Sequence, residues 1–117
     1  MANTSEIKKD IREVVKKLSN EYKVMLNEKN IVQNGRKYHG FAIDNSICLF
    51  VCNNQLQDGI IKAGQRASIF EKCYWLTLAE CSKKLLVFTD KDFYNKFIEE
   101  YYKYLDLGKI EVKFYSN

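Results

Sequence analysis

Apolar residues near the start of the chain recur every three or four positions, which is the spacing of one face of a helix. This face contains Ile7, Ile11, Val14, Val15 and Leu18. Asn3 and Glu6, three positions apart, have the form of a capping box, in which each side chain bonds a backbone N–H at the start of a helix. The pattern predicts a first helix over about residues 5–19.

The next part of the chain carries the shorter alternation and the turn signals of β-strands. Residues 22–26 predict a short strand, and the segment of residues 30–43 is broken by the hairpin turn Asn34-Gly35. A turn over residues 44–46 then precedes Ile47–Cys52, which are all apolar. Such a run is typical of a strand buried on both faces. We expect a three-strand meander whose last strand lies at the centre of the sheet.

Two further helix and strand pairs follow. A largely apolar helix is predicted over about residues 63–81, and a buried strand over residues 84–89. Asp90 can cap the next helix, which Gly108 ends, and residues 110–115 predict the last strand. The order α-β-β-β-α-β-α-β predicts an α/β fold with a mixed sheet, because strands joined through a helix run parallel.

Length and composition indicate one ordinary globular unit. The 117 residues suffice for a single domain, residues 1–117, and 46% of them are hydrophobic and 29% charged. The net charge of +4 permits a polyanionic partner without requiring one. No apolar run approaches the roughly 20 residues of a membrane span, and the first residues lack the apolar core of a signal peptide. We therefore expect an intracellular, cytoplasmic protein without a membrane partner.

The four cysteines, Cys48, Cys52, Cys73 and Cys81, lie in hydrophobic runs, and none forms a C-x-x-C pair. This placement is typical of small core residues in a reducing compartment, so we expect neither disulfides nor structural zinc. Cys48, Cys52 and the single histidine, His39, are a conceivable set of metal ligands. Side chains four residues apart on a strand are separated by about 13 Å, however, so this set does not suit one ion.

The order of the elements and two local stretches together resemble a known family. The stretches are residues 38–44 (YHGFAID), which lead into the apolar strand, and residues 84–90 (KLLVFTD), which lead into the last helix. Over about residues 5–115 the chain resembles the restriction-endonuclease-like, or PD-(D/E)XK, superfamily. The core of that superfamily is a helix, a three-strand meander, a helix and a strand. The resemblance implies a fold and not a function, because one fold hosts many activities.

The resemblance also implies where a nuclease site would lie. In that superfamily an acid on the second meander strand and an acid-x-Lys pair on the third strand hold one or two Mg²⁺ ions, and the lysine positions the attacking water. The matching pairs here are Phe50 with Cys52, or Val51 with Asn53, and neither contains the carboxylate that Mg²⁺ usually takes. No charged side chain occurs in residues 45–57, so a shifted register does not restore the motif.

A site displaced from that strand would use Asp44, Asp58, Glu111 and Lys113, with Mg²⁺ as its cofactor. Each residue also has a structural interpretation. Asp44 can open a turn, and Asp58, next to Gly59, can belong to a loop. Glu111 and Lys113 form an acid-x-Lys pair on the last strand, where alternating charged and apolar residues are also typical of an edge strand. Without this displaced set we expect no catalytic centre and no cofactor.

Two other features of the superfamily are incomplete. Glu6, Glu13 and Glu21 are candidates for the first-helix glutamate of some members, but the central acids that it would complete are missing. Gln65 lies where exonuclease-type members have a glutamine, and the tyrosine expected four residues later is Ile69.

Three hypotheses for the function remain. The first is a catalytically degraded nuclease-like domain that binds nucleic acid or serves as a subunit of a nucleic-acid-processing or defence-related assembly. Its phosphate contacts would come from Lys8, Arg12, Arg36, Lys37, Lys62 and Arg66. The second is an interaction module, a homo-oligomer or a subunit of a larger partner, with an interface formed by Tyr94, Tyr101, Tyr102, Tyr104 and Tyr115. The third is an active Mg²⁺-dependent nuclease that uses the displaced site.

Overall fold

The computed structural model describes residues 4–33, 36–44, 46–101 and 110–115, with side chains in these ranges except those of residues 4–10, 29–33 and 36–40. Its elements are α1 (Thr4–Tyr22), β1 (Asn27–Gln33), β2 (Arg36–Ile43), β3 (Ile47–Cys52), α2 (Ala63–Leu78), β4 (Lys83–Phe88), α3 (Lys91–Tyr101) and β5 (Ile110–Phe114). The order agrees with the sequence prediction, and the class is α/β with a mixed sheet.

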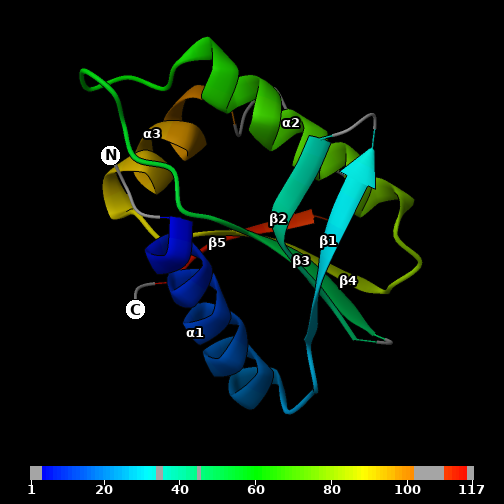
Figure 1. The fold of residues 1–117 in the computed structure, drawn as a ribbon. Helices are drawn as coiled ribbons and strands as arrows, with labels where there is room; N and C mark the ends of the chain where they lie inside the picture. The colour runs from blue at the N-terminus through cyan, green and yellow to red at the C-terminus, as the bar shows by residue number, and fades with distance from the viewer. Residues whose placement is uncertain (1–3, 34–35, 45, 102–109, 116–117) are drawn as a thin grey trace.

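The sheet contains five strands in the order β1-β2-β3-β4-β5, so neighbours in the sequence are neighbours in space (Figure 1). β1 with β2 and β2 with β3 pair antiparallel, which is the predicted meander. β3 with β4 and β4 with β5 pair in parallel, each after a helical connection. The apolar strand β3 is therefore the central strand, as the sequence predicted.

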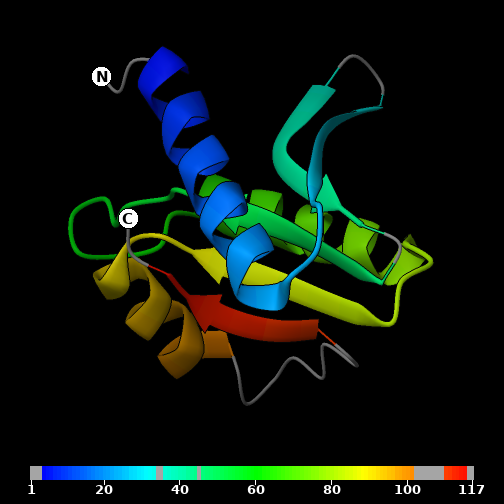
Figure 2. The ribbon, with the colours of Figure 1, turned by 90° about the horizontal axis from the view of Figure 1, so that it is seen from below.

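Both faces of the sheet are covered, α1 lying on one face and α2 with α3 on the other (Figures 1 and 2). Alternate residues of a strand point to opposite faces, so a strand covered on both sides must be apolar throughout. In β3, Leu49 and Val51 pack toward α1, whereas Phe50 and Cys52 pack toward α2 and α3. All six residues of β3 are buried.

The helices use the apolar spacing that the sequence shows. From residue 11 onward the buried residues of α1 are Ile11, Val14, Val15 and Leu18. Those of α2 are Ile69, Cys73 and Leu76, and those of α3 are Phe93 and Phe97. Asp90 caps α3 as predicted, because its Oδ1 accepts a hydrogen bond from the Phe93 N–H at 2.9 Å. The predicted Gly108 end of this helix lies outside the described residues.

The predicted strand over residues 22–26 is wrong. α1 continues to Tyr22 and closes with a Schellman motif, in which the Val24 N–H donates to Ser19 O at 3.0 Å and the Lys23 N–H to Asn20 O at 3.3 Å. Lys23 takes the left-handed conformation, with φ of 55°, that glycine usually takes at this place. The chain then enters β1 at Asn27, which is the true first strand of the meander.

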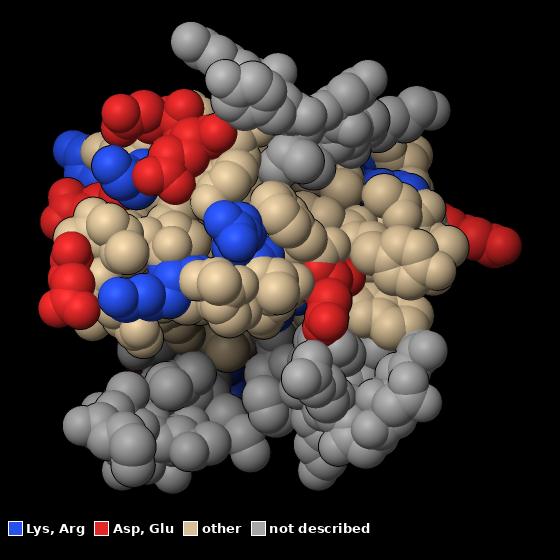
Figure 3. All heavy atoms as spheres, turned by 90° about the horizontal axis from the view of Figure 1, so that it is seen from above, with Lys and Arg blue, Asp and Glu red and all other residues tan. Residues whose placement is uncertain are grey.

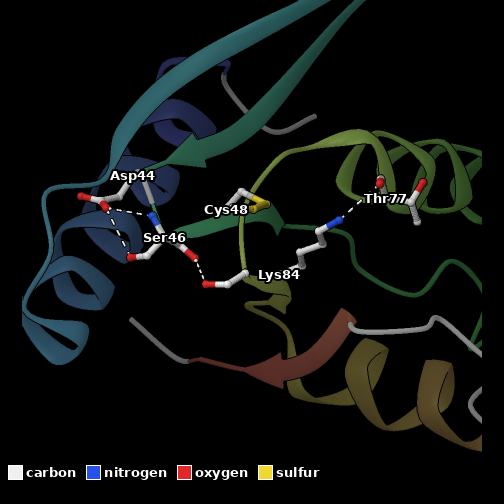
Figure 4. Close-up of a disulfide and its surroundings, with 7 residues drawn as sticks. Asp44, Ser46, Cys48, Thr77 and Lys84 are labelled. Carbon is white, nitrogen blue, oxygen red and sulfur yellow. Dashed lines mark hydrogen bonds between the residues drawn. A yellow bond between two sulfur atoms is a disulfide. The ribbon is translucent and has the colours of Figure 1, made fainter.

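α2 ends three residues before the prediction, at Leu78. Ala79 has an extended backbone (φ −74°, ψ 139°), and its N–H donates to Leu76 O at 3.2 Å. Lys84, at the start of the next strand, donates from Nζ to Thr77 O at 3.2 Å and occupies one of the last carbonyls of the helix (Figure 4). The helix therefore stops without a glycine or proline to mark its end.

The expectation that no cysteines are paired is wrong for Cys48 and Cys81, which form a disulfide (Figure 4). Their Cα atoms are 6.3 Å apart, so β3 and the connection between α2 and β4 bring together residues 33 positions apart. The pairing removes one observation on which the intracellular expectation was based. Cys52 and Cys73 are unpaired and buried.

No helix in the described part of the chain combines the length and the hydropathy that crossing a bilayer requires.

Candidate functional site

Asp44 lies between β2 and β3, and its carboxylate serves the backbone around it. Oδ1 accepts from the Ser46 N–H at 3.2 Å (Figure 4). Oδ2 accepts from the Met25 N–H at 3.3 Å. The Asp44 N–H donates to Ile47 O at 2.8 Å and closes the turn. The contacts with Ser46 and Ile47 are those of an aspartate that opens a turn, which is the structural interpretation of Asp44. The contact with Met25 also links the turn to the segment after α1.

Asp58 lies beyond the other end of β3, in a tight turn. Asp58 and Gly59 both have positive φ, 54° and 74°, and Gln57 and Ile60 exchange hydrogen bonds of 3.0 and 3.1 Å across them. This is the geometry of a type I′ turn, which favours Asp-Gly. The Asp58 carboxylate is exposed and lies 3.5 Å from Lys62 Nζ.

Glu111 and Lys113 lie on β5, on the face that carries α1. Lys113 Nζ donates to the Tyr22 hydroxyl at 2.7 Å and lies 3.9 Å from the Glu21 carboxylate. Lys83 Nζ lies 4.5 Å from the centre of the Tyr22 ring, and Lys113 Nζ lies 5.1 Å from it. We call these five residues, Glu21, Tyr22, Lys83, Glu111 and Lys113, the Tyr22 cluster.

The Tyr22 cluster holds the end of α1 against the edge of the sheet. The hydrogen bond to Tyr22 raises the pKa of Lys113, burial acts in the opposite direction, and the charges of Glu21 and Glu111 raise it further. With two ammonium groups and two carboxylates, the cluster is close to neutral. The first-helix glutamate that the sequence left without a partner, Glu21, meets the acid-x-Lys pair here.

The four candidate catalytic residues do not converge. Asp44 precedes β3 and Asp58 follows it, and a strand of six residues spans about 17–20 Å. Glu111 and Lys113 lie two strands away from β3, opposite Leu85 and Val87 of β4. Within the described residues no group of three potential metal ligands from His, Cys, Asp or Glu occurs.

The carboxyl ends of β3 and β4, where open α/β sheets commonly bind ligands, are held by hydrogen bonds among polar side chains. The Thr89 hydroxyl donates to Asn53 Oδ1 at 2.6 Å. Gln65 accepts from the Lys62 N–H at 3.0 Å and donates from Nε2 to Gln55 O at 2.7 Å, so it fastens the start of α2 to the preceding loop. The role of Gln65 in this structure is that of a helix cap.

The candidate phosphate contacts are spread over several elements. Arg12 is exposed on α1 and lies 3.9 Å from Glu28, whereas Lys62 and Arg66 lie at the start of α2. The side chains of Lys8, Arg36 and Lys37 lie outside the described part. Figure 3 views the side that is uppermost in Figure 1, and there the basic groups are separated by uncharged surface and adjoin acidic groups. On this face the described basic residues do not form one continuous patch.

The candidate interface tyrosines mostly pack inward. Tyr94 contacts Phe88 and Phe114, with ring centres 6.3 and 5.9 Å apart, and Tyr101 contacts Phe97 at 5.4 Å. Tyr115 is half-buried and packs against the part of the core that lies between α1 and the sheet. Tyr102 and Tyr104 lie outside the described residues. Among the side chains that the structure describes, the exposed large apolar ones are instead Met25, Ile60, Tyr74 and Leu78.

The unpaired cysteines lack the features of reactive thiols. Burial raises the pKa of Cys73 to about 12, with a further rise from the neighbouring Cys52, and burial also raises the pKa of Cys52. Lys72 Nζ lies 4.0 Å from Cys52 Sγ and lowers both values by less than burial raises them. A thiol that stays protonated at neutral pH is a poor nucleophile and a poor metal ligand.

Sequence reasoning missed Tyr22 and Lys83. The apolar pattern predicts a strand that begins at Tyr22 and another that begins just after Lys83, and it connects neither residue to the last strand. Glu111 and Lys113 alternate with apolar residues on the last strand, and this alternation was the sequence signal that both charges lie on one face of β5.

No family model, no curated protein and no solved structure matches this chain.

Proposed function

We propose that this chain is a catalytically empty domain of restriction-endonuclease-like architecture that acts by binding nucleic acid through its phosphates. The observation that carries the proposal is the chemistry of β3. The resemblance places the acid-x-Lys pair of the metal site on this strand, yet each of its residues is apolar and buried. A strand of this kind contributes packing and has no group that holds a metal or activates water.

The phosphate-binding part of the proposal is supported by exposed basic side chains in the middle of α1 and at the start of α2. Arg12 and Lys16 are one turn apart on α1 and are both exposed, and Arg66 is exposed in the first turns of α2. Lys62 lies beside Arg66, and its contact with the exposed Asp58 is a surface ion pair, which contributes little and is readily exchanged for a phosphate. The net charge of +4 is compatible with the same partner.

The test is a titration of labelled duplex DNA, single-stranded DNA and RNA at about 50 and 200 mM salt, with and without Mg²⁺ or Mn²⁺, in which retention and cleavage are both scored. We expect binding that weakens steeply with salt, and no cleavage. Replacing Arg12, Lys62 and Arg66 with alanine should lower the slope of log affinity against log salt by about one for each phosphate that is no longer neutralised. Lys91→Ala, an exposed lysine at the start of α3, is the matched control.

Two results would overturn the proposal. Metal-dependent cleavage that is abolished in Asp44→Ala would indicate an active nuclease with a displaced site. Absence of both binding and cleavage would favour an interaction module. The exposed side chains of Tyr74 and Leu78, one turn apart on α2 and 59% and 56% exposed, support that second function.

A further inference from the structure

β5 forms one end of the sheet and pairs along only one of its sides among the described residues. Its pairing with β4 is regular from Ile110 to Phe114, with no register shift. A regular edge strand without a bulge or proline presents a row of backbone donors and acceptors to a further strand. Figure 2 shows β5, in red, at this outer edge.

The direction of these backbone groups follows from one hydrogen bond. The N–H of Tyr115, which directly follows β5, donates to Phe88 O at 2.9 Å, so it points toward β4. Because backbone groups alternate in direction along a strand, those of Glu111 and Lys113 also point toward β4. The N–H and C=O groups of Ile110, Val112 and Phe114 therefore point toward the open edge.

We propose that β5 pairs antiparallel with β5 of a second copy of this chain, about a two-fold axis beside Val112. In this register Val112 of one chain pairs with Val112 of the other, and Ile110 pairs with Phe114 of the other chain. These are the residues whose backbone groups face the open edge. Glu111 of each copy is then opposite Lys113 of the other, so the two-fold axis gives two such pairs. Opposite charges in directly facing positions stabilise an antiparallel pair, whereas like charges oppose it.

Geometry and charge select the same register. Since Val112 and its neighbours at the edge form the hydrogen-bonded pairs, Glu111 and Lys113 fall in the non-hydrogen-bonded positions, where facing side chains approach most closely. Charged residues often protect an edge strand from pairing. Here the two charges have opposite sign and lie symmetrically about Val112, so they match an antiparallel copy.

The contacts within one chain leave room for the second copy. Lys113 donates to Tyr22 and lies near Glu21, but an ammonium group has three donors. Glu111 is exposed. On the opposite face Val112 and Phe114 are only partly buried. Val112 packs against the core, and Phe114 packs against Tyr94. The strand of a second copy would cover the apolar surface that remains.

The contact is short, so the dimer should dissociate on dilution. Stable interfaces commonly bury about 800 Å² on each partner, which is more than a five-residue strand provides alone. We therefore expect a monomer–dimer equilibrium in the micromolar range rather than a permanent dimer.

The test is sedimentation velocity of the full chain, without nucleic acid, from low to high micromolar concentration. Glu111→Lys places like charges opposite each other and should shift the protein to monomer, whereas Glu13→Lys, the same change on the exposed face of α1, should not. Val112→Pro removes an N–H that has no partner among the described residues and that the dimer would use, so it should also give monomer with little loss of fold. A circular dichroism spectrum confirms that each variant is folded.

A second measurement locates the contact. Equal amounts of ¹⁴N- and ¹⁵N-labelled protein are treated with a carbodiimide, which joins a carboxylate and an amine that are in contact. We expect a mixed-isotope peptide that links Glu111 to Lys113. A protein that stays monomeric at all concentrations, or a dimer that Glu111→Lys and Val112→Pro both leave unchanged, would overturn the proposal.

Discussion

Lys113 was a candidate catalytic residue in the sequence, and in the structure its side chain makes stabilising contacts. Its ammonium group donates to the Tyr22 hydroxyl, and the Glu21 carboxylate lies 3.9 Å away. These groups hold the charged form of Lys113 and raise its pKa above the ordinary 10.5, with the hydrogen bond from Lys113 to Tyr22 as the main cause. A lysine held in this way links α1 to β5.

The raised pKa predicts the pH dependence of stability. A lysine whose pKa is higher in the folded state contributes its full stabilisation below the unfolded pKa and loses it as the pH rises through the folded value. The difference in free energy of unfolding between the wild type and Lys113→Met should therefore be largest near pH 8 and should decrease above about pH 10.5. Urea unfolding of both proteins at several pH values measures this difference.

The matched control for this pH dependence is Lys91→Met, because Lys91 is exposed on α3. Its difference from the wild type should stay small and flat over the same pH range. A flat profile for Lys113→Met as well would show that the contact with Tyr22 does not stabilise the fold.

Asp44 illustrates what a sequence does and does not reveal about one residue. Its turn role was one of two interpretations open from the sequence, because Asp commonly accepts a hydrogen bond from the backbone two residues ahead. Its contact with the Met25 N–H was not predictable, since that residue is 19 positions away and was assigned to a strand. Local roles follow from local sequence, and contacts between distant segments do not.

At the scale of the elements, the order and type of the helices and strands from α1 to β5 were predictable, because apolar spacing determines which face packs. The exception is the strand expected over residues 22–26, where α1 ends and the chain turns into β1. The ends of α1 and α2 were not predictable. Lys23 adopts a left-handed backbone and Ala79 an extended one, and neither residue signals a helix end. The end of a helix that is followed by neither glycine nor proline is difficult to predict from the sequence.

The conformation of Lys23 predicts a stabilising substitution. Lys23→Gly removes the steric cost of positive φ, and we expect it to raise the free energy of unfolding by about 0.5–1 kcal/mol. Lys17→Gly, in the exposed middle of α1, should instead lower it by about 1 kcal/mol. Thermal unfolding of both variants compares the two sites. Equal losses at both positions would contradict the left-handed helix end.

The disulfide between Cys48 and Cys81 joins β3 to the segment after α2 and should contribute to the stability of the fold. Closing a loop of this length restricts the unfolded chain and stabilises the fold by about 3–4 kcal/mol. Cys81→Ser should lose this amount, and a reducing agent should destabilise the wild type but not the variant. Thermal unfolding with and without reductant measures both effects, and a count of four titratable thiols in the unfolded, unreduced protein would contradict the disulfide.

At the scale of the whole molecule, the candidate site was less predictable than the fold. The sequence correctly located an apolar central strand, but it could not show that Tyr22 and Lys113, 91 residues apart, are in contact. That contact depends on the register of β5 and on the last turn of α1. Whether distant polar residues meet is decided by strand registers and helix ends, which are weakly encoded locally.

The proposed dimer predicts the shape of the protein in solution. The radius of gyration of one chain is 13.5 Å. A compact globule with the residues of two chains would have a value of about 17.5 Å, and two sheets joined edge to edge should exceed it. Small-angle X-ray scattering at high concentration should give this larger value for the wild type and a value near that of one chain for Val112→Pro. A compact dimer below about 17.5 Å would indicate a different arrangement.

The apolar strand β3 also limits which changes this protein can accept. Phe50 is 0% exposed and Val51 is 1% exposed, so a carboxylate at either position would lose its hydration without gaining a partner. The fold would become unstable before a second substitution could supply a metal or a lysine. Metal-dependent hydrolysis therefore cannot be introduced at this strand through single substitutions. An engineer who wanted a nuclease here would have to introduce several charges and a water-filled cleft together.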